Sequence, residues 1–310
     1  MKLAGLLTPF VVALAFTASA PAQETDTEDT RVNDVRTFTL GEFSALSLRD
    51  GSITVPNDNK VFGVGHTPAE VATLLSQAGL PTDRLELSLQ PLLVKTAERV
   101  MLFDTGAGTN FGPSAGKLAA SMETAGIAPA IVTDIFISHS HGDHIGGLLN
   151  ASGALAYPNA TIHISAPEWA FLKGMSPDLA KASGVGQHDA LVAAITPKVA
   201  PFQPGTDIVP NIVKAVEIKG HTPGHSGYMI RSGKTSLFYI GDTAHHFVVS
   251  VRKPEWPCGF DVDATTAEAS RKAVLGAAAA GGQLVYAFHF PFPGVGKISG
   301  RDGDLRWAAK

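Results

Sequence analysis

The feature that most constrains this chain is a cluster of three histidines and one aspartate within six residues, at His139, His141, Asp143 and His144. The cluster follows the apolar run 131–137, which is short, β-branched and ended by a glycine-containing turn, so the run predicts a buried strand. Imidazole and carboxylate side chains on a tight loop after a strand can converge on one point, and they are ligands for zinc and neighbouring metals. Without a cation, several of these close polar groups would be left unsatisfied. The cluster therefore predicts a metal centre rather than a polar surface loop.

Residues of the same types recur at the ends of other apolar, strand-like runs. Upstream, the motif Asp104-Thr-Gly106 follows the run 100–103, and downstream the motif His221-Thr-Pro-Gly-His225 follows the run 212–218. The runs 236–240 and 284–288 end close to Asp242 and His289.

The ordered set Asp-x-Gly, H-x-H-x-D-H, His, Asp, His resembles that of the metallo-β-lactamase superfamily and covers nearly the whole chain after residue 22. Periodicity alone indicates a mixed α/β domain, with strands in two groups and helices between and after them. The resemblance implies the finer architecture, an α/β (α+β) fold arranged as a four-layer αββα sandwich.

The resemblance also implies two divalent metal ions, with zinc expected first and manganese, cobalt or iron compatible with the same ligand types. Two such ions would hold a hydroxide between them at neutral pH and polarise a carbonyl or phosphoryl oxygen, which is hydrolytic chemistry. The residues that match the family's ligand positions are His139, His141 and His221 for one ion, Asp143, His144 and His289 for the other, and Asp242 as the carboxylate bridging both.

Three further residues have candidate roles around these ligands. Asp104 resembles the aspartate that braces the histidine loop and orients a ligand, or it only forms the turn before Thr-Gly. His225 does not match a ligand position, so we expect it either to support a ligand residue or to be structural. His245 is a candidate catalytic residue together with Asp242: it donates a proton or hydrogen bond to the substrate, or it packs beneath Asp242.

Weaker motifs resemble the methyl parathion hydrolase and lactonase branch of the superfamily. They are His245 itself, the segment 288–294, and the segment 254–271 with its Phe260-Asp-Val-Asp263 motif and Arg271. This resemblance implies a hydrolase of lactones, aryl esters or phosphotriesters, hence a small-molecule substrate. Aromatic residues that either line an apolar pocket for it or fill the core are Trp169, Phe171, Phe247, Trp256, Phe290 and Phe292.

Four alternatives share parts of the pattern. A β-lactamase fits the export signal, but the dinuclear lactamases that resemble this chain lack an aspartate at the position of Asp242. A glyoxalase II-like thioester hydrolase has the same ligands, but its basic substrate patch is missing. A tRNA-processing nuclease is opposed by the formal net charge of −4, since nucleic-acid binding normally shows a basic patch. A non-enzymatic zinc-binding module is opposed by the complete ligand set.

The N-terminus predicts export. Lys2, the apolar stretch 6–16 and small residues around Ala20 are typical of a cleaved signal peptide over residues 1–22, followed by a flexible acidic arm over 23–36. The apolar stretch is too short to span a bilayer comfortably, so we expect a periplasmic or secreted protein without stable membrane association. The single cysteine, Cys258, cannot form an intramolecular disulfide, and residues 37–310 are expected to form one domain.

Local patterns predict several elements outside the ligand loops. Asp50-Gly51 between the runs 38–48 and 52–55 favours a hairpin. Thr67-Pro-Ala-Glu70 is a capping box that begins a helix reaching Gly79. Strands are expected over 85–95 and 99–103 and helices over 114–125 and 264–280, and the region 167–204 is expected to be helical and loop-rich.

Overall fold

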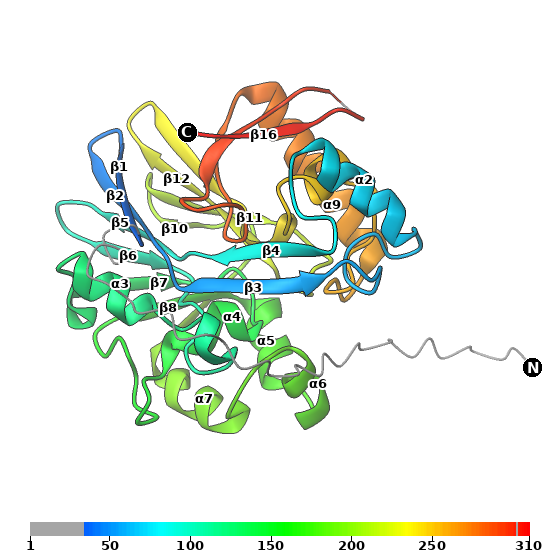
Figure 1. Cartoon of the computed structure of the whole chain (residues 1–310). Coiled ribbons are helices and arrows are strands. Elements are labelled where there is room, and N and C mark those ends of the chain that lie inside the picture. The colour runs from blue at the N-terminus through cyan, green and yellow to red at the C-terminus, as the bar shows by residue number, and fades with distance from the viewer. Residues whose placement is uncertain (1–33, 302) are drawn as a thin grey trace, which may run out of the picture.

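The computed structural model describes residues 34–301 and 303–310 (Figure 1). The predicted signal peptide and all but the last three residues of the predicted arm lie outside the described residues. The first strand, β1 (Val35–Leu40), begins inside the range expected to be an arm, because Val35 and Arg36 pair with Leu48 and Ser47 of the next strand. Among the described residues, no helix combines the length and the apolar character needed to cross a membrane.

Two seven-stranded sheets form the centre of the molecule. The first has the strand order β1-β2-β5-β6-β7-β8-β9, antiparallel up to β6 and parallel from β6 to β9. Its remaining strands are β2 (Phe43–Leu48), β5 (Leu92–Lys95), β6 (Val100–Phe103), β7 (Asp134–Phe136), β8 (Thr161–Ser165) and β9 (Val199–Phe202).

The second sheet follows chain order from β10 to β16, and its neighbours are antiparallel except β13 and β14, which are parallel. This parallel pair is joined through a long helix, as a parallel connection requires. The strands are β10 (Asp207–Val209), β11 (Val213–Glu217), β12 (Ser226–Ser232), β13 (Thr235–Tyr239), β14 (Leu284–Tyr286), β15 (Val295–Ser299) and β16 (Arg306–Ala309).

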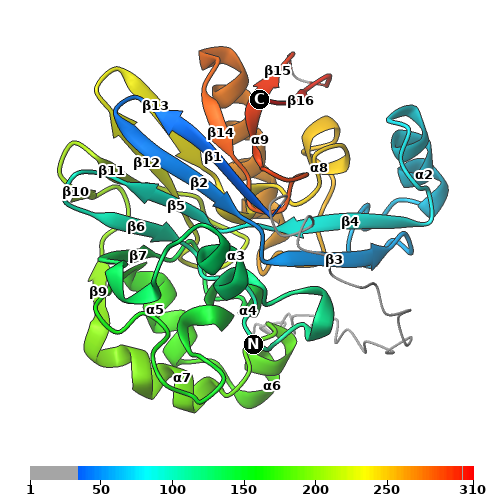
Figure 2. The same cartoon turned by 60° about the vertical axis from the view of Figure 1, so that its left-hand side comes forward.

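Helices cover the outer face of each sheet (Figures 1 and 2). The first sheet is covered by helices from the chain between β6 and β9, and the second by helices from the chain between β13 and β14. The helices are α3 (Leu118–Thr124), α4 (Gly142–Ile145), α5 (Ala166–Lys173), α6 (Pro177–Ala182), α7 (His188–Ile195), α8 (Val249–Arg252) and α9 (Ala264–Gly281).

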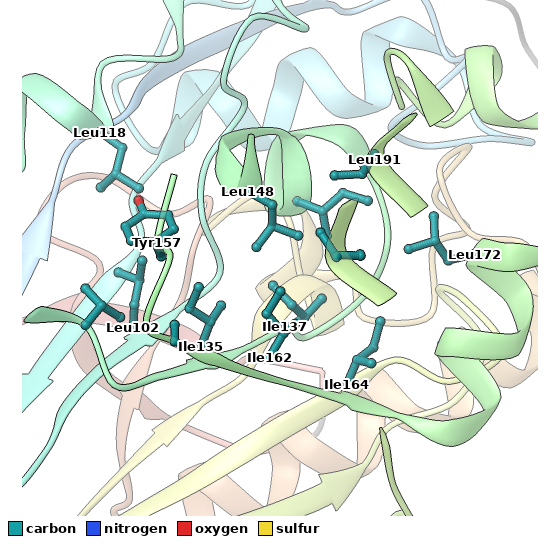
Figure 3. Packing of buried hydrophobic residues seen from close by; sticks show 14 of the residues in the cluster. Leu102, Leu118, Ile135, Ile137, Leu148, Tyr157, Ile162, Ile164, Leu172 and Leu191 are labelled. Carbon is teal, nitrogen blue, oxygen red and sulfur yellow. The ribbon is translucent and has the colours of Figure 1, made fainter. Parts of the chain in front are cut away.

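Three apolar clusters correspond to the three interfaces between these four layers. The outer cluster of the first sheet joins residues such as Leu102, Ile135 and Ile162 to Leu172 and Leu191 of its helices (Figure 3). A second cluster lies between the sheets, and a third packs α9 against the outer face of the second sheet. The predicted αββα sandwich is therefore confirmed, since each sheet has two apolar faces and each face is covered.

A separate two-stranded hairpin projects from the sandwich and carries a helix at its end (Figure 2). It consists of β3 (Gly51–Pro56) and β4 (Arg84–Leu89), with α2 (Pro68–Gln77) between them. The helix begins with the predicted capping box, in which Thr67 and Glu70 bond each other's backbone and side chain. Its apolar side packs with the hairpin in a fourth cluster that includes Val71 and Leu75.

The predicted hairpin across Asp50-Gly51 is wrong. β2 pairs with β1 through a turn at Gly41-Glu42 and with β5, while β3 pairs with β4. Asp50 is instead fully buried, and its carboxylate accepts hydrogen bonds from the backbone of Ala107, Gly116 and Leu118. These donors come from a distant part of the chain, so local turn chemistry could not predict them.

Other element boundaries differ from the expected ranges. The expected strand 85–95 is two strands in different sheets, because the chain turns at Gln90-Pro91 between β4 and β5. The expected helix 114–125 is shortened to α3 after a single 3-10 turn at Gly112–Ser114. Helix α9 ends one residue later than expected, with Gly282 in the left-handed conformation that favours glycine.

Asp134 on β7 is a buried carboxylate that stabilises the first sheet. It accepts hydrogen bonds from Arg99 at 2.9 and 3.0 Å, from Thr133 at 2.7 Å and from His163 at 2.9 Å. Burial by itself raises the pKa of Asp134, but the bonds from His163, Thr133 and Arg99 outweigh it and hold the pKa at about 2, below the ordinary 3.8. The stabilisation is therefore complete above pH 3.8 and is lost as the pH falls toward 2.

We expect Asp134→Asn to lower the free energy of unfolding at pH 7 by about 2 kcal/mol, the equivalent of this pKa difference. The deficit relative to the parent should narrow as the pH falls from about 4 toward 2, because the parent then loses the same charge. Chemical denaturation of both proteins at several pH values measures it. If the variant is less stable than the parent by the same free energy of unfolding at pH 7 and at pH 2.5, the charge of Asp134 does not stabilise the sheet as described.

Candidate metal centre

All seven predicted ligand residues meet at one edge of the sandwich, on loops that follow strand ends. The loop after β7 carries His139 and His141, and it leads directly into α4, which carries Asp143 and His144. The other three residues follow later strands. His221 lies in the turn between β11 and β12, Asp242 follows β13, and His289 follows β14. They form two groups of close ligand atoms, one of His139, His141, His221 and Asp242 and one of Asp143, His144 and His289.

Three ring nitrogens converge in the first group. His221 Nε2 lies 3.1 Å from His139 Nε2 and 3.0 Å from His141 Nδ1, and the latter two atoms are 3.1 Å apart. Three nitrogens bound tetrahedrally to one zinc ion are separated by about 3.3 Å at the usual bond length. The triangle therefore has nearly the size that one zinc ion requires.

The Asp242 carboxylate lies between the two groups. Its Oδ2 is 3.4 Å from His221 Nε2 and 3.6 Å from His139 Nε2, while its Oδ1 is 3.2 Å from His144 Nε2. In the second group, Asp143 Oδ2 lies 3.5 Å from His144 Nε2 and 3.4 Å from His289 Nε2. Asp242 Oδ2 also lies 3.2 Å from His289 Nε2, so it contacts nitrogens of both groups, while Asp242 Oδ1 faces the second group through His144.

Unpartnered buried atoms support a cation at this place. Within the described part of the chain, His144 Nε2, Asp242 Oδ1 and His245 Nε2 are buried side-chain atoms without a hydrogen-bond partner. All three point into the same small volume, since His245 Nε2 and His144 Nε2 each lie 3.2 Å from an oxygen of Asp242. Buried polar atoms are rarely left unsatisfied, so the residues fit a metal-binding group.

Electrostatics keep the first group in the form that binds metal. Burial, reinforced by the neighbouring His144, holds the pKa of His139 well below 6.5. Burial and then the facing His221 lower the pKa of His141 to about 3, and burial lowers that of His221 to about 4 despite its hydrogen bond to Asp261. All three rings are neutral at pH 7, and a neutral ring has a free lone pair for a cation.

The second group attracts positive charge. Burial alone would lower the pKa of His144, but the carboxylates of Asp242, Asp143 and Asp104 raise it well above 6.5. Burial would likewise raise the pKa of Asp242, but His144 and His289 hold it well below 3.8. The field that would keep a proton on His144 is the same field that favours a divalent cation there.

The Asp104 carboxylate accepts hydrogen bonds from three residues, two in the histidine segment and one on β13. Its Oδ1 accepts from the backbone of Ser138 at 2.7 Å, and its Oδ2 accepts from the Ser138 hydroxyl at 2.6 Å. The same Oδ2 accepts from His144 Nδ1 and from the Tyr239 hydroxyl, both at 2.7 Å. The bond to Nδ1 leaves His144 Nε2 as the nitrogen that faces Asp242, which is the tautomer a ligand needs.

Two residues to which the motif analysis attached no role hold His221. His221 Nδ1 donates to Asp261 Oδ1 at 3.0 Å, and Arg271 Nη1 donates to Asp261 Oδ2 at 3.3 Å. Arg271 is buried and also bonds the carbonyls of Pro254 and Trp256 at 2.9 and 3.0 Å. Both residues lie in the 254–271 segment used for the branch resemblance, so a signal was present without a role attached to it.

His225 and His245 lie on either side of Asp242. His225 Nε2 accepts from the backbone N–H of Asp242 at 2.9 Å, and its Nδ1 donates to the Ile218 carbonyl at 3.0 Å. His225 thus fixes the Asp242 backbone from outside the two groups. His245 lies inside, with Nδ1 at 3.7 Å from Cys258 Sγ and Nε2 toward the Asp242 carboxylate. The contact between Cys258 and this histidine was not expected.

A cavity of about 680 Å³ lies between α6 and α7 and has none of the seven ligand residues in its lining. It borders the metal loop through Asn110, which lines the cavity and donates to the Gly142 carbonyl at 3.3 Å. Most of the aromatic residues considered for a substrate pocket belong to apolar clusters or pack against them: Trp169, Phe171, Phe247, Trp256 and Phe290. Phe292 is half-buried.

The sequence model of the metallo-β-lactamase superfamily matches residues 91–303, which contain every residue of both ligand groups. The chain belongs to the metallo-β-lactamase superfamily. The prediction of a hydrolase from this superfamily is confirmed by that membership.

Similar superfamily structures cover most of the chain. The structure of AidC, described as a dizinc quorum-quenching lactonase, is 30% identical with a TM-score of 0.83 and covers 89% of this chain and 97% of its own. The hydrolase AbOPH of the β-lactamase superfamily is 26% identical with a TM-score of 0.81 over the same shares of the two chains.

Curated relatives match over shorter stretches. A ribonuclease Z from Salinibacter ruber is 35% identical over 79 residues, which are 26% of this chain and 21% of that protein. A ribonuclease Z from Synechocystis sp. is 34% identical over 101 residues, or 32% and 28% of the two chains. The matches thus span less than a third of either relative.

We expect Asp104→Asn to weaken metal binding about 10- to 100-fold, the usual cost of removing a group that orients a ligand. The amide can accept at one position only, so the contacts with Ser138, His144 and Tyr239 cannot all persist. Tyr239→Phe removes one of these bonds and should weaken binding less than 10-fold. Competition with a chromophoric chelator measures both affinities, and equal affinity for the parent and Asp104→Asn would refute the bracing role.

Proposed function

We propose that this superfamily member is a dinuclear metal-dependent hydrolase of lactones, aryl esters or phosphotriesters, from the methyl parathion hydrolase and lactonase branch. The observation that carries the proposal is the position of Asp242. Its carboxylate contacts both groups of ligand atoms: Oδ1 lies 3.2 Å from His144 Nε2, and Oδ2 lies 3.2 Å from His289 Nε2 and 3.4 Å from His221 Nε2. A carboxylate in this position can offset the charge of two closely spaced dications.

The residues present would hold one ion with His139, His141 and His221 and the second with Asp143, His144 and His289, with Asp242 shared. When bound, such ions lower the pKa of water and polarise a carbonyl or phosphoryl oxygen, and zinc is the first candidate among metals that this ligand set accepts. The protein's own contribution is to keep the first three rings neutral and to orient them.

Access to the centre is one-sided. Of the seven ligand residues, His141 is half-buried and the Asp143 side chain is 11% exposed, while the other five are almost completely buried. A substrate would therefore approach over His141 and Asp143. Buried walls on the remaining sides exclude water, which strengthens electrostatic interactions with the substrate.

His245 is the residue best placed to hold a proton next to the centre. Burial would lower its pKa, but the neighbouring Cys258 and Asp242 raise it well above 6.5. Its Nε2 has no hydrogen-bond partner and lies 3.2 Å from Asp242 Oδ2. We therefore assign His245 a hydrogen bond or proton at Nε2 that a substrate or leaving group receives, rather than a packing role alone.

Lactones are the first substrate class to test, because the lactonase AidC is 30% identical over most of both chains. A β-lactamase is disfavoured by Asp242, which the dinuclear lactamases resembled by this chain lack. A nuclease is disfavoured by the acidic net charge of −4, and the ribonuclease Z relatives match over short stretches. The decisive comparison is therefore among small-molecule esters.

A substrate panel tests the function directly. We expect the purified, zinc-loaded protein to hydrolyse at least one lactone, aryl ester or phosphotriester and to lose that activity with a chelator and regain it with metal. A β-lactam is included as the rival substrate and a structured RNA as the control for nuclease activity. Turnover of the β-lactam alone, or turnover that survives complete metal removal, would overturn the proposal.

The dinuclear arrangement has its own test in Asp242→Asn. We expect this variant to bind less than two ions per chain and to lose kcat by about 10²-fold or more, because an amide has no charge to offset two dications. His245→Ala should retain two ions per chain while its kcat or substrate preference changes. Metal content and kcat are measured on the same preparations. Two ions and near-normal turnover in Asp242→Asn would show that Asp242 is not shared.

A further inference from the structure

Glu168 is a completely buried carboxylate in the first turn of α5, outside the set of residues considered from the sequence. One of its oxygens contacts the loop that carries His139 and His141. Glu168 Oε1 accepts from the backbone N–H of Ser140 at 2.8 Å and from the Ser140 hydroxyl at 2.5 Å. Ser140 lies between the two histidines, so this oxygen holds the centre of that loop.

The other oxygen of Glu168 contacts the turn that carries His221. Glu168 Oε2 accepts from the Thr222 hydroxyl at 2.7 Å and from the backbone N–H of Gly224 at 2.9 Å. Thr222 directly follows His221. A single side chain therefore accepts four hydrogen bonds, two from each loop. Thr222 and Gly224 lie more than fifty residues from Glu168 in the sequence.

The N-terminus of α5 shapes the same turn through two further contacts. The Ser165 hydroxyl accepts from the Glu168 backbone at 3.2 Å and donates to the Gly224 carbonyl at 2.6 Å. A Cβ atom on Gly224 would lie 2.2 Å from the Glu168 backbone nitrogen, so only glycine permits this approach. The turn of His221 thus contacts the N-terminus of α5 through both side chains and backbone.

We propose that Glu168 is a positioning residue that holds the loop of His139 and His141 and the turn of His221 in the mutual arrangement a metal ion requires. The three ring nitrogens lie 3.0–3.1 Å apart, although they come from two segments about eighty residues apart. Burying a carboxylate costs free energy unless it is fully hydrogen-bonded, so this residue favours the one arrangement in which all four donors reach it.

A second connection between the two segments lies on the other side of the histidines, where the Ser226 backbone donates to the Ser138 carbonyl at 2.9 Å. That bond joins the start of β12 to the segment that follows β7 and does not connect the tips of the two loops. Glu168 contacts the tips themselves, at Ser140 and Thr222. Its loss should therefore disturb the spacing of the ring nitrogens more than the overall fold.

The proposal rests on the proposed function only in that the three histidines bind an ion. The test uses the full chain with Glu168→Gln, which keeps the size of the side chain. A glutamine oxygen can accept on one side, but its NH₂ group then faces a backbone N–H of either Ser140 or Gly224. One of the two loops consequently loses the hydrogen bond from its backbone N–H to residue 168.

We expect Glu168→Gln to bind its most tightly held zinc ion about 10- to 100-fold more weakly than the parent, in a chelator competition assay. The cobalt-substituted variant should also show a changed visible absorption spectrum, because the geometry around the three nitrogens is altered. These readouts do not depend on turnover. A residue that only contributed stability would leave both of them unchanged once the protein is folded.

Asp134→Asn is the matched control. Asp134 is a buried carboxylate with comparable hydrogen bonding, but its partners Arg99, Thr133 and His163 lie outside the two loops. It should lower thermal stability and leave the zinc affinity and the cobalt spectrum within error of the parent. A drop in affinity of the same size in both variants would overturn the proposal, because general destabilisation would then explain it.

Thr222→Val keeps the test decisive if Glu168→Gln fails to fold. The variant keeps the shape of the side chain and removes one of the four donors, so we expect several-fold weaker zinc binding in a folded protein. Parental affinity and cobalt spectra in Thr222→Val and in any folded Glu168→Gln would overturn the positioning role. Two zinc ions in the parent without hydrolysis of any substrate would contradict the proposed function and leave the role of Glu168 intact.

Discussion

The structure depends on bringing seven ligand-type side chains together at one edge of a β-sandwich, five of them almost completely buried. Each buried ring must satisfy its second nitrogen within the protein, and each does so differently. His144 bonds the Asp104 carboxylate, His221 bonds Asp261, and His289 bonds the Ser88 carbonyl at 3.0 Å. These outer contacts decide which ring nitrogen faces inward. The ability of the centre to bind metal therefore depends on the residues that hold the ligands as much as on the ligands themselves.

The sandwich provides the rigidity that this arrangement needs. The ligand loops leave β7, β13 and β14, whose side chains belong to the buried clusters between and outside the sheets. Helix α5 then closes the site from the side, because Glu168 reaches both histidine loops. Loops fixed at strand ends and again at their tips can hold several nitrogens at the separations that one ion accepts.

The sequence was informative where function requires particular residue types close together. The ligand cluster could be recognised because its four members lie within six residues: His139, His141, Asp143 and His144. The capping box at Thr67 likewise predicted the start of a helix, because its hydrogen bonds are local. The sequence was misleading at Asp50-Gly51, a pair typical of hairpin turns that here makes long-range hydrogen bonds instead. There the Asp50 carboxylate bonds three backbone groups more than fifty residues away, and no local pattern encodes such a contact.

The amino-acid sequence by itself determined the ligand types, their order along the chain and, through family resemblance, the αββα architecture. The sequence also indicated Asp104 and His225 as supporting residues, but only the tertiary structure decided the contacts that they and the other supporting side chains make. Glu168 belongs to no motif considered from the sequence, and Asp261 and Arg271 lie in a motif that gave them no role; their roles follow from the contacts of Glu168 with Thr222 and of Asp261 with His221 and Arg271. The physical reason is that a buried charge is tolerated only where folding supplies its partners, and these partners are distant in sequence.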